Sequence, residues 1–373
     1  MRTDIRPLGS TRVACLIGGT PWFACLWHST VGQKSSGMQV HHEISQGRSA
    51  VHWLTGVIIV AGMLNKQENS CRSDPSAHKT MKASIEIARS QLSSGKSTTD
   101  NLTQDTLAVM LLSNNANQTC HALQNLIGQL LTWNPLDIFV FSLNNSLYTR
   151  NAWEMPQLNV IFMSLYEHWE TPDQAGSRDL WTASRFGEDY RRMGHWRLAF
   201  QMEFALELGY KFVLQIDDDS AFLQPIEYNL IQYMASHDLK MAARNIIAHD
   251  EPDVTQGLAE LAKFFLVSEG LQPKSLFIEC RPANISGLYT SGVGGTQDGG
   301  YSTKYIYGNF VIISLDFWFQ EEVQRLVKLV LSTGGHFRHR WNEQQVQSLV
   351  WQIFLARDEF HLFDFPYEHP VKV

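Results

Sequence analysis

An alternation of short apolar runs with a helical segment, beginning near Thr106, is the strongest constraint on the fold. The run "TLAVMLLS" at 106–113 has the apolar content of a buried strand, and so does "DIFVFSLN" at 137–144. Between them, "CHALQNLIGQLL" at 120–131 carries apolar residues at helical spacing. Strand, helix and strand in this order predict a βαβ unit with parallel strands.

The same alternation returns further along the chain. The segment "WRLAFQMEFALELGY" at 196–210 reads as a helix ended by Gly209, and it leads into the apolar run "KFVLQI" at 211–216. Open sheets built from such units bind their ligands beyond the carboxyl ends of the strands. We therefore expect an α/β fold of the nucleotide-binding kind.

Three consecutive carboxylates, Asp217, Asp218 and Asp219, follow directly after that last run. Carboxylates this close together repel one another unless a cation or hydrogen-bond donors neutralise them. Mg²⁺ and Mn²⁺ take oxygen ligands of this kind and bridge the phosphates of a nucleotide. The alternative is an Asp-rich turn after a strand, because Asp also favours turns.

The first hundred residues have a different character. Segments 13–27 and 48–64 are apolar, but the second contains an uncharged run of about fifteen residues, against the roughly twenty that span a bilayer. We expect an N-terminal region at 1–64 with one membrane anchor, the alternative being no membrane segment. Residues 65–105 are rich in Ser, Lys, Thr and Gln, which is typical of a stem or linker. The globular domain then spans 106–373.

Composition narrows the class of protein. The chain has 373 residues, 44% of them hydrophobic, which is enough for a sizeable core. A net charge of −7 without a long basic run gives no reason to expect a nucleic-acid partner. Five scattered cysteines include no CxxC pair, so a zinc pattern is absent, while one or two disulfides stay open. Four sequons favour the secretory pathway, at Asn101, Asn117, Asn144 and Asn284.

The C-terminal third continues the alternation of strands and helices. "YGNFVIISLDFW" at 307–318 predicts a strand and a turn, and "QEEVQRLVKLVLSTGG" at 320–335 predicts a helix stopped by two glycines. A further helix is predicted in "RWNEQQVQSLVWQIFL" at 340–355, with Asn342 as its N-cap and Gln345 at the capping-box position. His369, in "FHLFDFPYEHPVKV", is a candidate third metal ligand, although a lone terminal His is more often an ordinary surface residue.

Several ordered segments together form a recognisable pattern. They are "YEHWETP" (166–172), "DYRRMGHW" (189–196), "QIDDDSAF" (215–222), "YGNFVI" (307–312), "GGHFRHRW" (334–341), "VQSL" (346–349) and "HLFDFPYEHP" (361–370). Their order and spacing resemble the fungal-type α-1,2-mannosyltransferases of glycosyltransferase family 15, Golgi enzymes that extend yeast O- and N-linked mannans. The likeness runs from near Thr106 to Pro370.

The resemblance implies a nucleotide-diphospho-sugar transferase fold of the GT-A type, in a single α/β catalytic domain with a central, mostly parallel sheet. It further implies GDP-mannose as the donor substrate, Mn²⁺ (or Mg²⁺) as the cofactor, retention of the anomeric configuration, and a glycan acceptor on protein or lipid. Members of this family are type II membrane proteins with a short N-terminal anchor. The implied location is the Golgi membrane, with the catalytic domain in the lumen.

The resemblance also implies a set of metal ligands. Asp217 stands at the metal-binding Glu of the family's Glu-Pro-Asp motif, and Asp219 keeps the acidic character of its last position. His369 keeps the His of the terminal Arg-His-Pro motif, which reads Glu-His-Pro here. We expect these three residues to hold the cation, Asp217 and Asp219 to act in catalysis with it, and Asp218 to lie against the donor.

The motif "DYRRMGHW" contributes further candidates for binding the donor. Guanidinium groups of Arg191 and Arg192 suit a diphosphate, which they can hold bidentately, while the alternative is a solvated helix start. Tyr190 is expected to support the same site by stacking or hydrogen bonding.

Three further positions depart from the family pattern. Val311 replaces the family's proposed nucleophile, a Glu, and valine cannot attack an anomeric carbon. Gln347 replaces a His, and Glu343 stands where Asp is usual, so we retain Glu343 as a catalytic candidate. Without the nucleophile, retention requires front-face transfer or another acid, for which Asp316 and Glu343 are nearest in the sequence.

These features predict a metal-dependent, retaining glycosyltransferase that transfers mannose from GDP-mannose through an α-1,2 linkage. The cation would neutralise the charge that grows on the departing GDP. Two alternatives stay open: the same fold with another nucleotide sugar, and a catalytically inactive, carbohydrate-binding relative.

Overall fold

The computed structural model describes residues 75–95, 105–143, 159–247, 250, 254–275 and 304–371. The two segments considered as membrane anchors, at 13–27 and 48–64, lie outside the described residues. Within the described ranges, no helix has both the length and the apolar character needed to cross a bilayer.

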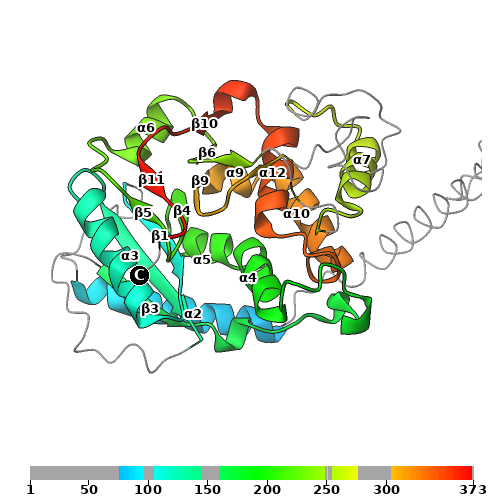
Figure 1. Cartoon of the computed structure of the whole chain (residues 1–373), viewed down its shortest axis with the longest axis horizontal. Helices are drawn as coiled ribbons and strands as arrows, with labels where there is room; N and C mark the ends of the chain where they lie inside the picture. The colour runs from blue at the N-terminus through cyan, green and yellow to red at the C-terminus, as the bar shows by residue number, and fades with distance from the viewer. Residues whose placement is uncertain are drawn as a thin grey trace, which may run out of the picture. The chain divides into compact units, whose positions relative to one another are not determined.

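A seven-stranded sheet runs through the described part of the chain, in the order β10-β6-β9-β4-β1-β2-β3 (Figure 1). Its strands are β1 (Leu107–Leu112), β2 (Leu136–Ser142), β3 (Asn159–Ser164), β4 (Phe212–Asp217), β6 (Met241–Ala243), β9 (Phe310–Ser314) and β10 (Phe360–Leu362). Strands β1 to β4 pair in parallel, as does β10 with β6, and only β9 runs antiparallel to its neighbours. The predicted α/β fold with a mostly parallel sheet is confirmed.

Helix α3 (Ala116–Gln129) connects β1 to β2 and completes the predicted βαβ unit. The helix begins earlier than its apolar spacing indicated, because the side chain of Asn115 accepts hydrogen bonds from the main-chain N–H groups of Asn117 and Gln118. Leu107 pairs with Leu136 and Leu112 with Phe141, so the two strands are in register over their full length.

The single helix expected at 196–210 is two helices. Helix α4 (Glu188–Ala199) begins after Gly187, and α5 (Gln201–Glu207) follows without a loop. The break is at Phe200, whose φ of −125° leaves the helical region while its ring is buried against Phe204 and His168. Gly209 ends the segment with a φ of +90°, a conformation that favours glycine.

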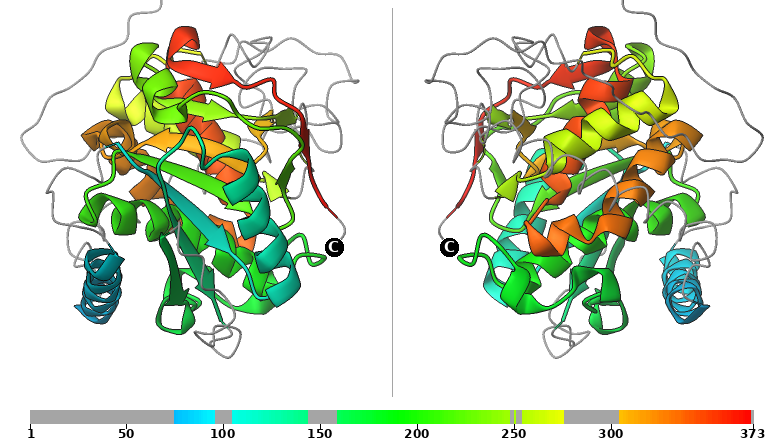
Figure 2. Two further views of the ribbon diagram at one scale, coloured as in Figure 1. Left: turned by 90° about the vertical axis from the view of Figure 1, so that its left-hand side faces the viewer. Right: turned by 90° about the vertical axis from the view of Figure 1, so that its right-hand side faces the viewer.

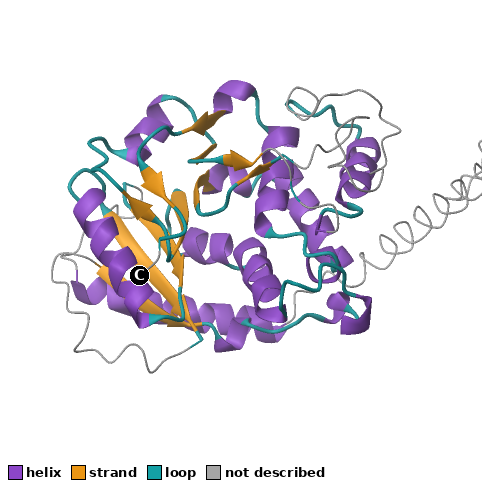
Figure 3. Ribbon diagram, viewed as in Figure 1, coloured by secondary structure: helices purple, strands orange, loops and turns teal. Residues whose placement is uncertain are grey.

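The remaining helices cover both faces of the sheet (Figure 2). Alternate residues of β1 face different cores: Val109 packs with α3 and α6 (Leu230–Ser236), whereas Met110 faces the core that includes α4 and α5. The latter core also receives α7 (Leu258–Glu269), α9 (Leu315–Trp318), α10 (Glu321–Thr333) and α12 (Glu343–Phe354). Strands therefore lie between two helical layers (Figure 3).

Two small antiparallel pairs extend from the main sheet. Strand β5 (Ala221–Phe222) pairs with β11 (Tyr367–Glu368), and β7 (Ile246–Ile247) pairs with β8 (Tyr305–Ile306). The short helix α11 (Gly335–Arg338) lies between α10 and α12 in the chain. Because β5 follows β4 after a turn, its pairing brings the C-terminal segment to the end of a central strand.

The region expected to be a stem, 65–105, contains a helix that packs on the domain. Helix α2 (Pro75–Gly95) buries Met81, Ile85 and Ala88 in the same core as α5. Arg89 donates a hydrogen bond to the carbonyl of Glu207, the last residue of α5. The prediction of a linker rested on the low aromatic content of this region and did not take account of the apolar residues on one face of this helix. The domain therefore begins before residue 106.

Helix α2 offers a test of this packing. We expect Ile85→Ala to lower the free energy of unfolding by about 2–4 kcal/mol, because it empties a site in the core. The matched variant Ile87→Ala should change it by less than about 0.5 kcal/mol, since Ile87 is 51% exposed on the same helix. Urea unfolding of the full chain measures both, and a loss for Ile85→Ala as small as that expected for Ile87→Ala would show that α2 does not contribute to the core.

Candidate functional site

The three consecutive carboxylates lie where β4 leaves the sheet. Asp217 is the last residue of β4, and Ser220 closes the turn by donating its N–H to the carbonyl of Asp217. Asp217 pairs with Leu112 at the end of β1, so Ser113 lies at the same edge. There the Ser113 hydroxyl donates a hydrogen bond to the carboxylate of Asp218. Burial raises the pKa of Asp218, an effect that the bond from Ser113 offsets only in part.

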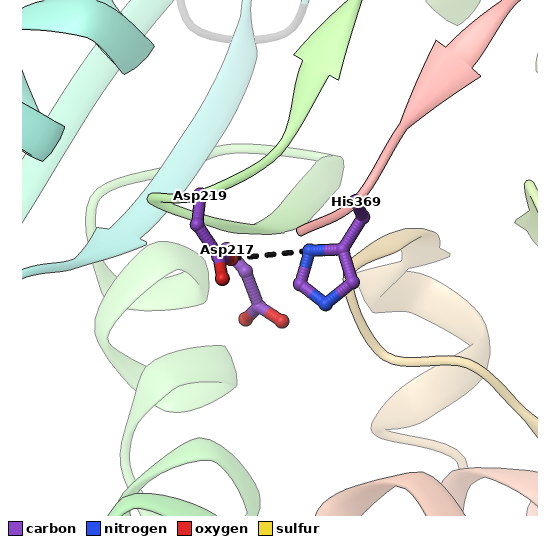
Figure 4. A group of neighbouring side chains, drawn as sticks. All are labelled: Asp217, Asp219 and His369. Carbon is purple, nitrogen blue, oxygen red and sulfur yellow. Dashed lines mark ion pairs between the residues drawn. The ribbon is translucent and has the colours of Figure 1, made fainter. Parts of the chain in front are cut away.

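His369 reaches this edge from the other end of the chain. The pairing of β11 with β5 carries it there, and Val371 donates its N–H to the carbonyl of Asp219 at 2.7 Å. Imidazole Nδ1 of His369 lies 3.1 Å from Oδ1 of Asp219 (Figure 4). One ligand atom from each of Asp217, Asp219 and His369 lies within 4.8 Å of the others. The predicted convergence of these three residues is therefore present.

The electrostatics of this cluster suit a cation. Burial alone would lower the pKa of His369, but its hydrogen bond to Asp219 and the charge of Asp217 outweigh that effect and raise the pKa. Two carboxylates and one imidazole are oxygen and nitrogen ligands that Mn²⁺ accepts. A cation that binds these atoms must displace the proton of His369, so its binding releases a proton.

A cavity of about 410 Å³ opens over the carboxylates. Its walls come from the end of β1, one face of α4, the turn after β4, and the C-terminal segment. The lining residues are Leu112, Ser113, Asn114, Tyr190, Met193, Arg197, Asp217, Asp218, Asp219, Tyr307, Gln344 and His369. This position, beyond the carboxyl ends of parallel strands, is where open α/β sheets bind ligands.

Arg197 lines the cavity from α4 and was not among the predicted residues. Its side chain is 3% exposed, with Nη2 2.6 Å from Oδ1 of Asp217 and Nη1 2.8 Å from Oε1 of Glu343. Burial would lower the pKa of Arg197, but these carboxylates outweigh that effect and raise it. Its spacing from Tyr190 and Met193 places all three on one helix face, which was a signal available in the sequence.

Glu343 is the first residue of α12 and is completely buried. The Asn342 side chain accepts a hydrogen bond from the main-chain N–H of Glu343 at 2.9 Å, which fixes the start of the helix. Burial raises the pKa of Glu343, and the Arg197 guanidinium only partly offsets this. Glu343 does not line the cavity, and within the described part of the chain this expected catalytic residue is connected to the site through its ion pair with Arg197.

The two arginines of "DYRRMGHW" do not face the cavity, contrary to expectation. Arg191 is buried, and its guanidinium donates to main-chain carbonyls of Thr182, Ala183, Phe186 and Phe337. Nη2 of Arg192 lies 2.7 Å from Oε1 of Glu188, so this guanidinium is paired within its own helix. Successive helical residues point in different directions, so the face that carries Tyr190 excludes both.

Tyr190 does line the cavity, as expected for a residue that supports the site. Its hydroxyl accepts hydrogen bonds from Nη2 of Arg340 at 3.1 Å and Nδ2 of Asn342 at 3.3 Å. The Arg340 guanidinium lies 3.9 Å from the ring centroid of Phe186, which packs beside Tyr190. These contacts fix the orientation of the Tyr190 hydroxyl.

The residue at the position of the family's nucleophile is in the core. Val311 is fully buried in the middle of β9 and pairs with Gln215 of β4. Gln215 in turn accepts a hydrogen bond from Gln347 at 3.0 Å and donates one to the carbonyl of Gly308 at 2.9 Å. The side chains of Val311, Gln215 and Gln347, at and around the position of the family's nucleophile, are therefore uncharged.

Asp316, one of two acids considered as a replacement for that nucleophile, lies at the wrong edge of the sheet. It follows β9, and β9 runs antiparallel to β4, so Ser314 pairs with Phe212 at the start of β4. Asp217 is at the opposite end of the same strand. Asp316 therefore cannot act beside the cavity.

Two glycines in the recognised segments allow close approach of main chains around the site. A Cβ at Gly308 would lie 2.8 Å from Cγ of Gln344 and 3.2 Å from Oε1 of Glu343. A Cβ at Gly194 would lie 2.2 Å from Oδ1 of Asn342. Segments far apart in the sequence thus pack directly against one another at α12.

Comparison with known proteins agrees with this arrangement. The profile of the family described as glycolipid 2-alpha-mannosyltransferase matches residues 152–372. The O-glycoside alpha-1,2-mannosyltransferase omh1 of Schizosaccharomyces pombe is 23% identical over 225 residues, which are 60% of this chain and 53% of that protein. The probable mannosyltransferase KTR4 of Saccharomyces cerevisiae is 26% identical over 168 residues, 43% of this chain and 34% of that one.

Two solved structures share the fold. Core-mannan synthase A (CmsA/Ktr4) from Aspergillus fumigatus, in its Mn/GDP form, has a TM-score of 0.59 at 18% identity, over 73% of this chain and 76% of that chain. Ktr4p from S. cerevisiae in complex with GDP has a TM-score of 0.57 at 15% identity, over 84% of this chain and 86% of that chain.

The chain spans about half the length, or less, of the two relatives named above. The family match nevertheless covers more than half of this chain, and it includes both the turn with Asp217 and Asp219 and the segment with His369. The chain therefore belongs to the glycolipid 2-alpha-mannosyltransferase family, glycosyltransferase family 15.

Proposed function

We propose that this protein is a metal-dependent, retaining glycosyltransferase that transfers mannose from GDP-mannose to a glycan acceptor on protein or lipid, through an α-1,2 linkage. The convergence of Asp217, Asp219 and His369 within 4.8 Å, in the lining of a cavity on the ligand-binding edge of the sheet, carries this proposal. Family membership supports the reaction class, and the Mn/GDP form of a relative with the same fold supports the choice of cofactor and nucleotide.

The charges that line the cavity support a requirement for metal. Among its described lining residues, Arg197 is the only guanidinium, and it is already paired with two carboxylates. A diphosphate placed here would meet three Asp carboxylates without a free arginine to balance its charge. When bound by Asp217, Asp219 and His369, Mn²⁺ supplies positive charge to the departing diphosphate.

The other lining residues suit binding and orientation of the donor. Ser113 and Asn114 follow β1, and Tyr190 presents its hydroxyl from α4. Asp218 is held by Ser113 beside the proposed cation site. These groups provide hydrogen-bonding partners for the nucleotide.

The arrangement of acids favours front-face transfer. In the described lining of the cavity, the carboxylates are Asp217, Asp218 and Asp219, and the first and last of these are proposed metal ligands. In front-face transfer, the acceptor oxygen bonds to the anomeric carbon as the bond to the GDP oxygen breaks. The proton of the acceptor hydroxyl then passes to the departing phosphate, so a protein nucleophile is not needed.

The proposed setting is the Golgi membrane, with an N-terminal anchor and a lumenal catalytic domain. Family membership and the sequons support a place in the secretory pathway. Asn117 is exposed at the first turn of α3, where a glycan can be attached, while Asn101, Asn144 and Asn284 lie outside the described residues.

One observation favours a second candidate function. The neutral Val311, Gln215 and Gln347 replace or surround the position of the family's nucleophile, as an inactive carbohydrate-binding relative would allow.

Turnover of the donor separates the active enzyme from the inactive relative. We expect the full chain with Mn²⁺ to consume GDP-mannose in preference to other nucleotide sugars, and mass spectrometry with a slow donor analogue to find no glycosyl adduct on the protein. An adduct on a carboxylate would contradict front-face transfer, and GDP binding without any turnover would establish the inactive relative.

The metal ligands can be tested by Asp219→Asn. We expect Mn²⁺-dependent GDP binding to weaken by roughly ten- to a hundredfold, because the change removes a charged ligand, and donor turnover to fall with it. Isothermal titration calorimetry measures the affinity. Asp364→Asn is the matched control, since that side chain is fully exposed, and normal binding by Asp219→Asn would refute the metal assignment.

Val311 is expected to be a packing residue. Val311→Ala should lower the free energy of unfolding by about 1–3 kcal/mol, because it truncates a fully buried side chain, while donor turnover by the folded protein is retained. Val267→Ala, at a position 76% exposed on α7, should be nearly neutral. Denaturant unfolding and a turnover assay give the two readouts, and loss of turnover without loss of stability would point to a direct part for Val311 in the reaction.

A further inference from the structure

The buried guanidinium of Arg197 connects three elements of the fold at the cavity. It extends from α4, contacts Asp217 at the end of β4 at 2.6 Å, and contacts Glu343 at the start of α12 at 2.8 Å. Its third nitrogen, Nε, is buried and makes no hydrogen bond. The two carboxylates therefore account for the position of this guanidinium.

Glu343 is the fixed end of this connection. Its side chain is 0% exposed, and its main-chain N–H is capped by Asn342 at the first turn of α12. Gly308 and Gly194 pack closely on both oxygens of this carboxylate, since a Cβ at Gly308 would lie 3.2 Å from Oε1 of Glu343 and a Cβ at Gly194 would lie 3.3 Å from Oε2. A side chain confined in this way can hold Arg197 in one place.

Asp217 is the adjustable end. Its side chain is 25% exposed and lines the cavity, so without a partner it could adopt several rotamers. A charge-assisted bond from a rigid, planar guanidinium to Oδ1 removes that freedom. The carboxylate is then held in the place where it lies within 4.8 Å of Asp219 and His369.

We propose that Arg197, anchored by Glu343, is a positioning residue that orients the carboxylate of Asp217 for a divalent cation. This inference rests on the proposed function, in which Asp217 is a metal ligand. Glu343 has a second effect, because its negative charge cancels the positive charge that Arg197 brings near the cation. The pair thus orients Asp217 without repelling the metal.

The test separates orientation from charge. The double variant Arg197→Gln/Glu343→Gln removes one positive and one negative charge, so the net charge near the cavity stays the same. We expect the affinity of the full chain for Mn²⁺ alone, measured by the electron paramagnetic resonance signal of free Mn²⁺, to weaken by roughly ten- to a hundredfold. The matched control Arg89→Gln/Glu86→Gln, which removes an ion pair on the exposed face of α2, should bind Mn²⁺ as the unchanged protein does.

Arg197→Lys is a second variant, and it disturbs the fold less than the double variant because it keeps a positive charge in the buried site. It retains the charge beside Glu343 but cannot hold two carboxylates in the geometry of the planar fork, so Mn²⁺ binding should again weaken by at least about tenfold. Glu343→Gln alone should also weaken binding, because the positive charge of Arg197 is then uncancelled. Circular dichroism shows which variants are folded, and only folded ones are compared.

The outcomes distinguish this inference from the function on which it rests. If the unchanged protein binds Mn²⁺ and a folded Arg197 variant binds it within about threefold of the same affinity, the positioning role is refuted and the metal site stands. If the unchanged protein does not bind Mn²⁺, the proposed metal site and this inference are both overturned. Weaker binding by Arg197→Lys, with the control unchanged, supports the positioning role.

Discussion

The buried ion pairs of Arg197 are the interaction on which the arrangement of the site depends. A guanidinium removed from water is strongly unfavourable unless carboxylates neutralise it, and Asp217 and Glu343 do so from two different elements. The same contacts fix the end of β4 relative to the start of α12. Two of the departures from the family pattern, Asp217 for Glu and Glu343 for Asp, meet at this one guanidinium.

The C-terminal segment completes the site through main-chain pairing. Strand β11 pairs with β5, which follows directly after the turn of acidic residues, and this pairing sets the position of His369 beside Asp219. A two-residue strand has little stability by itself. Tyr367 adds to it by donating its hydroxyl to the carbonyl of Asn309 at 2.8 Å, which ties the segment to the residue before β9.

Three side chains in the interior of the sheet next to the site, those of Val311, Gln215 and Gln347, are uncharged. Gln215 lies between Val311 and Gln347, and its amide is satisfied by Gln347 and by the carbonyl of Gly308. A buried carboxylate in place of Val311 would need a compensating donor or a cation. The uncharged side chains of Val311, Gln215 and Gln347 are consistent with a reaction in which the leaving phosphate, rather than a protein group, accepts the proton of the acceptor.

The sequence by itself determined the βαβ unit, the mostly parallel sheet and the acidic turn after β4, because apolar periodicity and turn residues are local signals. It also pointed to His369, through the order of the recognised segments. Only the tertiary structure showed that Arg191 binds main-chain carbonyls, that Asp316 is at the far edge of the sheet, and that Arg197 joins Asp217 to Glu343. Those outcomes depend on helix orientation and strand direction, which bring together residues far apart in the chain and which no local pattern records.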